Sequence, residues 1–468
     1  MVDPIRATGL SDDENRIANH LLQQLEDRKD RNMLRSSFYD GKRAARQVSA
    51  VVPPQYQRLG LVLGWSAKAV DALARRCNID GFAWPDGDLD SLGMGVLEEE
   101  NQLKSELSGG RTNALKHGAA FLVNTTGAEG EPKSLIHGKD ALNATADWNG
   151  RTRRLDNLLS VLGRKDDKVT EFALYLPNLT ITVVNDGGWR VKDRQEHVYG
   201  VPAEPLTYKP QGRPFGYSRI TRPIMGLQDA AVRALIRTEG HMDFYSYPEL
   251  ILLGADASAF KDEQGNTLPT WQARMARIKG IPDDEDAPTD ALARVAIEQV
   301  AASSPAPHLA QLNALAKMFA REASLPDSAV AITDMANPTS AEAYDASQYE
   351  LIAEAEGAVD DFDRPTARAV RRGLMILNGL TEEPESWRTI GAKWRNPRFE
   401  SRAAAADAGS KQLAAIPWLA DTTVGLEMMG LTEAQIKRAL AEKRRVDGLA
   451  TLKALTAPAA PVADGNAG

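Results

Sequence analysis

Apolar side chains recur every three to four residues over most of the first 120 residues, which is the spacing of one face of an α-helix. A first helix is predicted after Ser11, because Ser11 and Glu14 have the spacing of a capping box. Its apolar stripe continues through Ile17, Leu21, Leu22 and Leu25. A further helix is predicted from Val96 to Gly118. The N-terminal quarter is therefore expected to be mainly helical.

The pattern changes between Ala119 and Pro214, where short runs of β-branched and aromatic residues favour strands. Strands are predicted at 119–123, 172–176 and 179–184. The turn Asp186-Gly187-Gly188 favours a hairpin between the last of these and a strand that begins at Trp189. A helical insert is predicted at 152–162. This part of the chain is expected to be rich in β-structure.

A long amphipathic helix is predicted from Thr221 to about Tyr247. Thr221 can cap this helix, and Pro223 suits its first turn. If the helix is unbroken, it is about 39 Å long. Its outer positions carry basic and acidic side chains in balance, so a solvated face is the simplest interpretation.

The segment that follows has a mixed pattern. A strand is predicted at 247–253, a short basic helix at 271–278 and an acidic loop at 283–286. A second amphipathic helix is predicted at 307–323, with its apolar residues on one face. The two amphipathic helices therefore flank a separate lobe.

A very long helical pattern runs to about Leu377. Thr339 and Glu342 supply a second capping box at its start. Pro365 lies inside the pattern, removes one backbone donor and clashes with the preceding turn. A kink or break is therefore predicted near Asp363.

Short helices are predicted after Asn378, with a capped helix at 432–445. Residues 451–468 are rich in alanine, proline and glycine and are expected to be disordered. Long helices combined with one β-rich stretch predict an α+β fold that is predominantly helical. The chain has 468 residues, so more than one compact lobe is expected.

Composition and charge narrow the class of protein. Charged residues near the N-terminus interrupt any apolar core of a signal peptide. The longest apolar run, Leu59–Trp65, is far too short to cross a bilayer. A soluble protein with no membrane partner is therefore expected. The single cysteine, Cys77, excludes an internal disulfide and is predicted to be a buried, inert thiol. The net charge of −8 disfavours a broad basic face for nucleic acid. It does not exclude a protein past which DNA slides, and a charge of this size is also common among soluble proteins.

Signals of enzymatic chemistry are mostly missing. The sequence has no phosphate-binding loop of the packaging-ATPase type, and its six histidines are at least 20 residues apart. Ser218 follows the start of a nucleophile-elbow pattern that lacks the closing glycine, so a bend or cap is the favoured role. Asp360, Asp361 and Asp363 could hold a metal ion, but a solvated helix face or a pairing with Arg364 is favoured. We therefore expect a protein without a cofactor or metal that is not an enzyme.

Several short motifs occur in a fixed order. They are His197–Leu206, Gly212–Ile220, the stretch Asn-Pro-Thr-Ser-Ala-Glu-Ala at 337–343, and Trp394–Pro397. In this order they resemble the portal proteins of tailed, siphovirus-type double-stranded DNA bacteriophages. The first two resemble the junction where the β-rich wing of those proteins ends and a stem helix begins. The resemblance covers roughly residues 90–445.

The resemblance implies a portal fold with wing, stem, clip and crown regions. The implied regions are N-terminal helices and a β-rich wing (1–212), a first stem helix (213–247), a clip (248–306), a second stem helix (307–325), a tunnel loop (326–339), a long kinked wing helix (340–378), a crown (379–450) and a disordered tail (451–468).

The resemblance also implies roles for individual residues. In the tunnel loop, the residues expected to contact DNA are Asp334, Asn337 and Thr339. On the stem, the residues expected to face the channel are Arg222, Arg233, Arg237, Lys317 and Arg321. In the clip, the residues expected to dock the terminase and the adaptor are Arg274, Arg277, Lys279, Asp283, Asp284, Glu285 and Asp286.

The function implied by the resemblance is a ring of about twelve subunits at one capsid vertex, through which DNA is packaged and ejected and which links head to tail. The expected partners are further copies of the chain, the terminase large subunit, a head-completion adaptor protein, the major capsid protein and viral double-stranded DNA. The expected location is the portal vertex of the virion, and the host cytoplasm during assembly. Two alternatives stay open: another virion structural protein, either capsid-associated or a tail component, or a metal-dependent nuclease that uses Asp360, Asp361 and Asp363.

Overall fold

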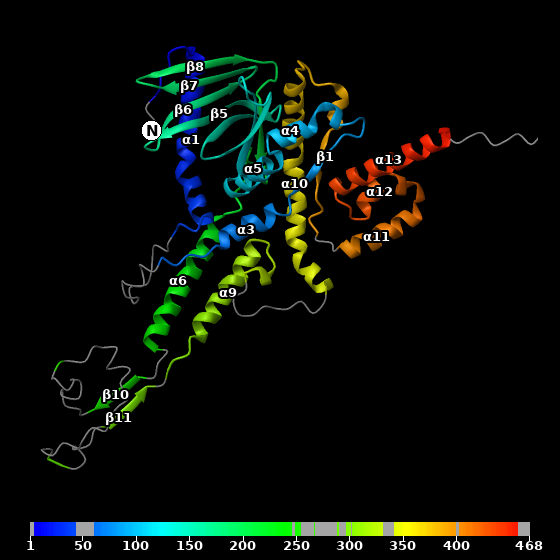
Figure 1. The fold of residues 1–468 in the computed structure, drawn as a ribbon. Helices are drawn as coiled ribbons and strands as arrows, with labels where there is room; N and C mark the ends of the chain where they lie inside the picture. The colour runs from blue at the N-terminus through cyan, green and yellow to red at the C-terminus, as the bar shows by residue number, and fades with distance from the viewer. Residues whose placement is uncertain are drawn as a thin grey trace, which may run out of the picture.

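The computed structural model describes residues 4–43, 60–245, 249–253, 266, 288–289, 296–300, 302–330, 341–398 and 402–456. Long helices are combined with antiparallel sheets, so the predicted α+β fold is confirmed. Figure 1 shows a body of sheets and helices from which one pair of helices projects.

Helix α1 (Asp12–Tyr39) lies against a five-stranded antiparallel sheet of order β4-β5-β6-β7-β8 (Figure 1). The predicted capping box is confirmed, since the Ser11 hydroxyl accepts from the Glu14 amide and the Glu14 carboxylate accepts from the Ser11 amide at 2.8 Å. Leu21 of α1 packs with Phe172 and Ile181 on one face of the sheet. The strands are β4 (Ala144–Asn149), β5 (Arg154–Lys165), β6 (Lys168–Leu176), β7 (Leu179–Asn185) and β8 (Trp189–Glu196).

A second sheet, of order β3-β2-β9, covers the other face of the first. Its strands are β2 (Ala119–Thr126), β3 (Ser134–Asp140) and β9 (Ala203–Thr207). Successive side chains of β2 point to opposite faces, as they must in a strand. Phe121 and Val123 pack toward the five-stranded sheet, whereas Ala120 and Leu122 join the main core on the opposite side.

The helical insert predicted at 152–162 is wrong, because these residues belong mostly to β5. Leu158 packs on the side of the three-stranded sheet and Leu159 on the side of α1, so both faces of β5 are buried. A strand buried on both faces loses the alternation of apolar and polar residues, and a short apolar run then cannot be distinguished from a helix by periodicity.

The main core lies between the three-stranded sheet and a group of helices. The elements around it are β1 (Ile79–Ala83), paired with β12 (Gly391–Trp394), the helices α3 (Trp65–Ala74), α4 (Met94–Glu100), α5 (Leu103–His117) and α10 (Ala341–Asn378), and the 3-10 turns η1 (Asp90–Leu92) and η4 (Glu385–Thr389). The single helix predicted at 96–118 is two helices, separated at Gln102, whose φ is 45°. Cys77 is fully buried, as predicted, and its thiol lies 3.8 Å from the carbonyl oxygen of Ala355.

Helix α10 runs through Pro365 without interruption, so of the predicted kink or break near Asp363 the break is wrong. The helix packs along its length on β2, β3, β9 and β12. Tertiary packing supplies most of the stability of a protein helix, so the loss of one backbone hydrogen bond at proline does not end this one.

Helices α6 (Arg222–Tyr245) and α9 (Ala306–Glu322) confirm the two predicted amphipathic helices. The predicted cap of α6 is also confirmed, because Thr221 Oγ1 accepts from the amide of Ile224 at 3.4 Å. Strand β10 (Glu249–Leu253) lies within the strand predicted at 247–253 and pairs antiparallel with β11 (Ala296–Val300). This two-stranded ribbon lies at the far end of the helix pair (Figure 1), and α9 is followed by the 3-10 turn η3 (Asp327–Ala329).

A C-terminal helical group lies beside α10 (Figure 1). It consists of α11 (Arg402–Ala415), η5 (Pro417–Asp421), α12 (Thr423–Met428) and α13 (Glu433–Thr456). The disorder predicted from residue 451 is wrong for 451–456, because the leucine- and alanine-rich sequence before Pro458 favours helix. Residues 457–468 lie outside the described residues. Across the described part of the chain, none of the helices has a stretch that is both long and apolar enough to span a membrane.

Candidate functional site at the paired helices

Helices α6 and α9 pack side by side and leave the body of the molecule together (Figure 1). Near the body, Ala231 and Ala234 of α6 and Leu312 and Phe319 of α9 are buried in the main core. The small alanine side chains of α6 allow the two helices to approach closely. The apolar faces of the two helices therefore attach the pair to the body of the molecule.

A second face of α6 is covered by a neighbouring segment and not by α9. Val232 and Ile236 are buried against Leu61 and Leu63. On α9, by contrast, the apolar side chain of Met318 is 58% exposed. The helix pair is amphipathic, and other residues of the same chain cover only part of its apolar surface.

The five basic residues that the sequence assigns to the channel wall are spread along both helices. Arg222, Lys317 and Arg321 are exposed, whereas Arg233 and Arg237 are partly buried. Because α6 leaves the body and α9 returns to it, Arg222 and Arg321 lie at the body end of the pair. The other predicted site residues lie outside the described residues: Arg274, Arg277, Lys279, Asp283, Asp284, Glu285, Asp286, Asp334, Asn337 and Thr339.

Arg219, directly before α6, anchors the helix pair to the body. Its guanidinium donates to the carbonyl oxygens of Ala69, at the middle of α3, and Ala323, at the end of α9, each at 2.5 Å. The same group lies 2.8 Å from the carboxylate of Glu354 on α10. The Arg219 side chain is only 4% exposed. One buried side chain thus joins the start of α6 and the end of α9 to the long helix.

Glu354 is the acidic partner in this anchor. Lys209 donates to its carboxylate at 2.5 Å, and the Tyr208 hydroxyl also donates to it. Burial by itself would raise the pKa of Glu354, but Arg219 and the hydrogen bonds from Lys209 and Tyr208 lower that pKa to about 2. Glu354 is therefore ionised in the folded protein at neutral pH.

The Glu354→Gln variant is expected to be less stable than the wild type at pH 7 and to lose less stability in acid. The folded-state pKa of Glu354 is about 2, below the ordinary value of 4.5. The carboxylate therefore contributes stability that is fully present above pH 4.5 and is lost as the pH falls toward 2. Urea unfolding at several pH values in this window should give a shallower slope of stability against pH for the variant. Glu350→Gln, an exposed position on the same helix, should keep the wild-type slope; equal slopes for all three proteins would contradict this assignment.

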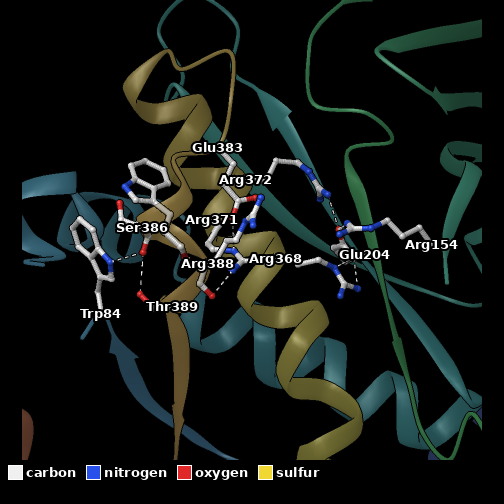
Figure 2. A network of polar contacts seen from close by, with 11 residues as sticks. Trp84, Arg154, Glu204, Arg368, Arg371, Arg372, Glu383, Ser386, Arg388 and Thr389 are labelled. Carbon is white, nitrogen blue, oxygen red and sulfur yellow. Dashed lines mark hydrogen bonds and ion pairs between the residues drawn. The ribbon is translucent and has the colours of Figure 1, made fainter. Parts of the chain in front are cut away.

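A second buried network holds α10 against β9 (Figure 2). The carboxylate of Glu204 on β9 accepts from Arg368 at 2.7 Å and from Arg372 at 2.5 Å, and Arg154 lies 3.7 Å away. Burial opposes ionisation of Glu204, but Arg372 and Arg368 outweigh it and lower the pKa. The strand and the long helix are therefore joined by a charged contact whose carboxylate is only 3% exposed.

Ser218 has the structural role that the sequence favours. Its hydroxyl donates to the carbonyl oxygen of Lys116 at 2.6 Å and accepts from the amide of Ile220 at 2.9 Å. The side chain is buried at the entry to α6. Ser218 thus shapes the turn that directs the chain into α6.

The three aspartates considered as metal ligands do not converge. Asp361 accepts from the backbone amide of Lys209 at 3.0 Å, and Asp363 accepts from the indole nitrogen of Trp394 at 2.7 Å. Within the described ranges, no group of three or more His, Cys, Asp or Glu side chains is placed to hold a metal ion. Asp361 and Asp363 instead tie α10 to its neighbours.

Comparison with known proteins decides the family. The sequence model of the family described as "Phage portal protein, SPP1 Gp6-like" matches residues 18–448, which is most of the chain. The chain belongs to this family of phage portal proteins. Membership makes the chain a portal vertex protein and a structural component of the phage particle, not an enzyme.

Known relatives of this portal family member come from mycobacteriophages. The chain is 27% identical over 396 residues to the portal protein of Mycobacterium phage L5, covering 80% of this chain and 77% of the relative. It is 26% identical over 408 residues to the portal protein of Mycobacterium phage D29, covering 84% and 81%.

Two solved structures of gene transfer agent (GTA) particles also contain similar chains. One, from the neck of an empty particle, has a TM-score of 0.44 at 14% identity and covers 79% of this chain and 90% of that one. The other, from the neck of a native particle, has a TM-score of 0.43 at 12% identity and covers 86% and 98%.

Proposed function

We propose that copies of this chain close into a ring of about twelve subunits around an axial channel, through which viral double-stranded DNA is packaged and ejected. Helices α6 and α9 of each copy would form the stem that lines this channel. The observation that carries the proposal is the helix pair itself, which projects from the body with an apolar side chain, Met318, left 58% exposed. A neighbouring copy of the chain would cover this exposed apolar surface.

The other regions follow from this placement of the stem. The β10–β11 ribbon at the far end of the pair would belong to the clip (248–306), and residues 326–339 would form the tunnel loop. The two sheets with α1 and α10 would form the wing, and residues 379–450 the crown inside the capsid. The residues that would contact DNA from the tunnel loop are Asp334, Asn337 and Thr339.

The stem surface would guide DNA without holding it. The five basic residues of the two helices are interspersed with acidic ones such as Asp229 and Glu239. Each phosphate that a lysine or arginine neutralises adds affinity and salt dependence, so a uniformly basic wall would hold the DNA in place. A balanced wall gives weak, distributed contacts that permit movement.

The clip would dock two partners in turn, the terminase large subunit during packaging and a head-completion adaptor afterwards. Its charged residues at 274–279 and 283–286 would make these contacts. The wing would contact the major capsid protein. Assembly would take place in the host cytoplasm, and the finished ring would occupy the portal vertex of the virion and link head to tail.

Cysteine labelling of the assembled protein tests the channel. Cys77 is buried and its pKa is raised to about 12 by burial, so it contributes little background reactivity. In Lys317→Cys, the new thiol on α9 is expected to react with a small maleimide and to resist a maleimide on a polymer too bulky for the channel. In Lys192→Cys, on the exposed surface of β8, both reagents should react.

Electron microscopy of the same samples supplies the second measurement. Closed rings with an axial hole are expected, and dissociated protein should expose both cysteines to both reagents. The proposal is wrong if the particles stay monomeric under all conditions, or if the bulky reagent labels Lys317→Cys as fast in rings as it labels Lys192→Cys.

A further inference from the structure

A pocket of about 380 Å³ lies away from the helix pair, between α1 and the start of the three-stranded sheet. One wall is the C-terminal half of α1. The others are the end of α5 at His117, the beginning of β2, and the loop 213–217 that leads toward α6. Neither Glu354 nor Glu204 lines it.

Four arginines converge on this pocket. Arg28, Arg31 and Arg35 are spaced by three and four residues on α1, which places them on one helix face, and Arg213 comes from the loop opposite. The guanidinium of Arg28 lies over the ring of Phe215, with its carbon 5.1 Å from the ring centroid. Arg35 donates to the carbonyl oxygen of His117 at 2.7 Å, which fixes that side chain at the wall.

The positive charge of this group is not compensated by any direct ion pair among the described residues. Among the described residues, no carboxylate lies within ion-pair distance of the four guanidinium groups. Burial, together with Arg31 and Arg213, lowers the pKa of Arg35 to about 10. Burial and Arg31 also lower the pKa of Arg28, although Asp147 and Asp27 act in the opposite direction. An anion that entered the pocket would relieve this repulsion.

A second feature indicates which kind of anion fits. Apolar and aromatic side chains, among them Leu25, Phe121 and Phe215, line the pocket beside the arginines. His117 also lines it, and burial lowers the pKa of this histidine to about 3, so the imidazole is neutral and adds no charge. Within the described part of the chain, its Nδ1 atom is buried without a hydrogen-bond partner. The pocket thus combines a cationic rim with an apolar lining.

We propose that this pocket docks an acidic peptide segment of a protein partner, with carboxylates on the arginines and an apolar side chain on the lining. The arginine fork matches carboxylate geometry, and the ring of Tyr217, a lining residue that is 42% exposed, adds contact area that a peptide can use. Duplex DNA fits less well, because its phosphates lie on a convex, uniformly charged ridge that has no apolar group to place in the pocket. The proposal depends on residues within one copy and does not require the ring.

Fluorescence anisotropy with the full-length protein tests this proposal. The probe is a short labelled peptide in which glutamates alternate with leucines, and the comparison probes are the same peptide with glutamines and a labelled DNA duplex. The double variant Arg31→Gln with Arg213→Gln removes two exposed arginines of the rim. It is expected to weaken binding of the glutamate peptide by about tenfold or more. The single variant Arg31→Gln, at an exposed helix position, should show a smaller loss in the same direction and guards against misfolding of the double variant.

The matched control is Arg6→Gln with Arg16→Gln, which removes the same charge at side chains that are 89% and 78% exposed outside the pocket. Full affinity of this control for the glutamate peptide, together with weak binding of the glutamine peptide, would support the proposal. Three results would overturn it: no measurable binding of the glutamate peptide to the wild type, equal losses in the rim and control variants, or a larger loss for duplex DNA than for the peptide.

Discussion

Replacement of Glu204 by glutamine is expected to lower the free energy of unfolding by about 3–5 kcal/mol. The carboxylate is 3% exposed and accepts hydrogen bonds from Arg368 and Arg372, with Arg154 nearby. Glutamine is nearly the same size, so the change removes the negative charge and leaves the arginines beside it without compensation. Breaking one side of a buried ion pair costs far more than the intact pair contributes, because the remaining charge stays in a poorly solvated place.

Urea unfolding at neutral pH measures this effect, and Glu171→Gln is its control. Glu171 is also a strand carboxylate paired with a cation, Lys192, at 2.8 Å, but both side chains are accessible to solvent. Loss of an exposed pair costs about 0–1 kcal/mol. If the two variants lose similar amounts of stability, the Glu204 network does not hold α10 against β9.

The Phe319→Ala variant is expected to lose a similar amount, about 3–5 kcal/mol, and to loosen α9 in particular. The phenyl ring is fully buried in the main core, and its centroid lies 5.1 Å from that of the Trp65 ring on α3. Truncation removes the apolar contact and leaves a cavity that the rigid surroundings fill only in part. Because α9 meets the core through few large side chains, we expect its amide hydrogens to exchange faster while those of α10 change less.

Met318→Ala provides a matched control, since the neighbouring methionine on the same helix is 58% exposed. Its substitution should change the stability of the isolated chain by less than about 0.5 kcal/mol. Hydrogen exchange followed by mass spectrometry separates the two variants segment by segment. Uniformly faster exchange over α9 and α10 in Phe319→Ala would show that the ring supports the whole core and not the attachment of α9.

The sequence predicts those elements best whose burial is one-sided or whose ends carry a local signal. Helix α1 follows from the Ser11 capping box, and α6 and α9 follow from their apolar stripes. Both faces of strand β5 are covered, so its sequence lacks the alternation of a strand and predicts a helix instead. The uninterrupted course of α10 through Pro365 depends on packing partners from four strands, and no local signal reports them.

The buried contacts that anchor the helix pair and α10 could not be predicted from the sequence. Arg219 and Ala323 are 104 positions apart, and Glu204 and Arg372 are 168 apart. A single sequence offers many acidic and basic residues at such distances, and only the fold selects the pairs that meet. The order of the short motifs was more informative, because it pointed to the portal family that the comparison over residues 18–448 then showed.

The contact between Arg219 and the carbonyl oxygen of Ala323 has a consequence for how this architecture can change over evolutionary time. The chain departs into α6 and comes back from α9 at one place, within reach of a single guanidinium. The segment between Arg219 and Ala323 therefore leaves the body and rejoins it at the same place. This segment can gain or lose helical turns, or exchange its outermost lobe, without a change in the distance between its two points of attachment. Lineages with longer or shorter projections could thus share one unaltered body.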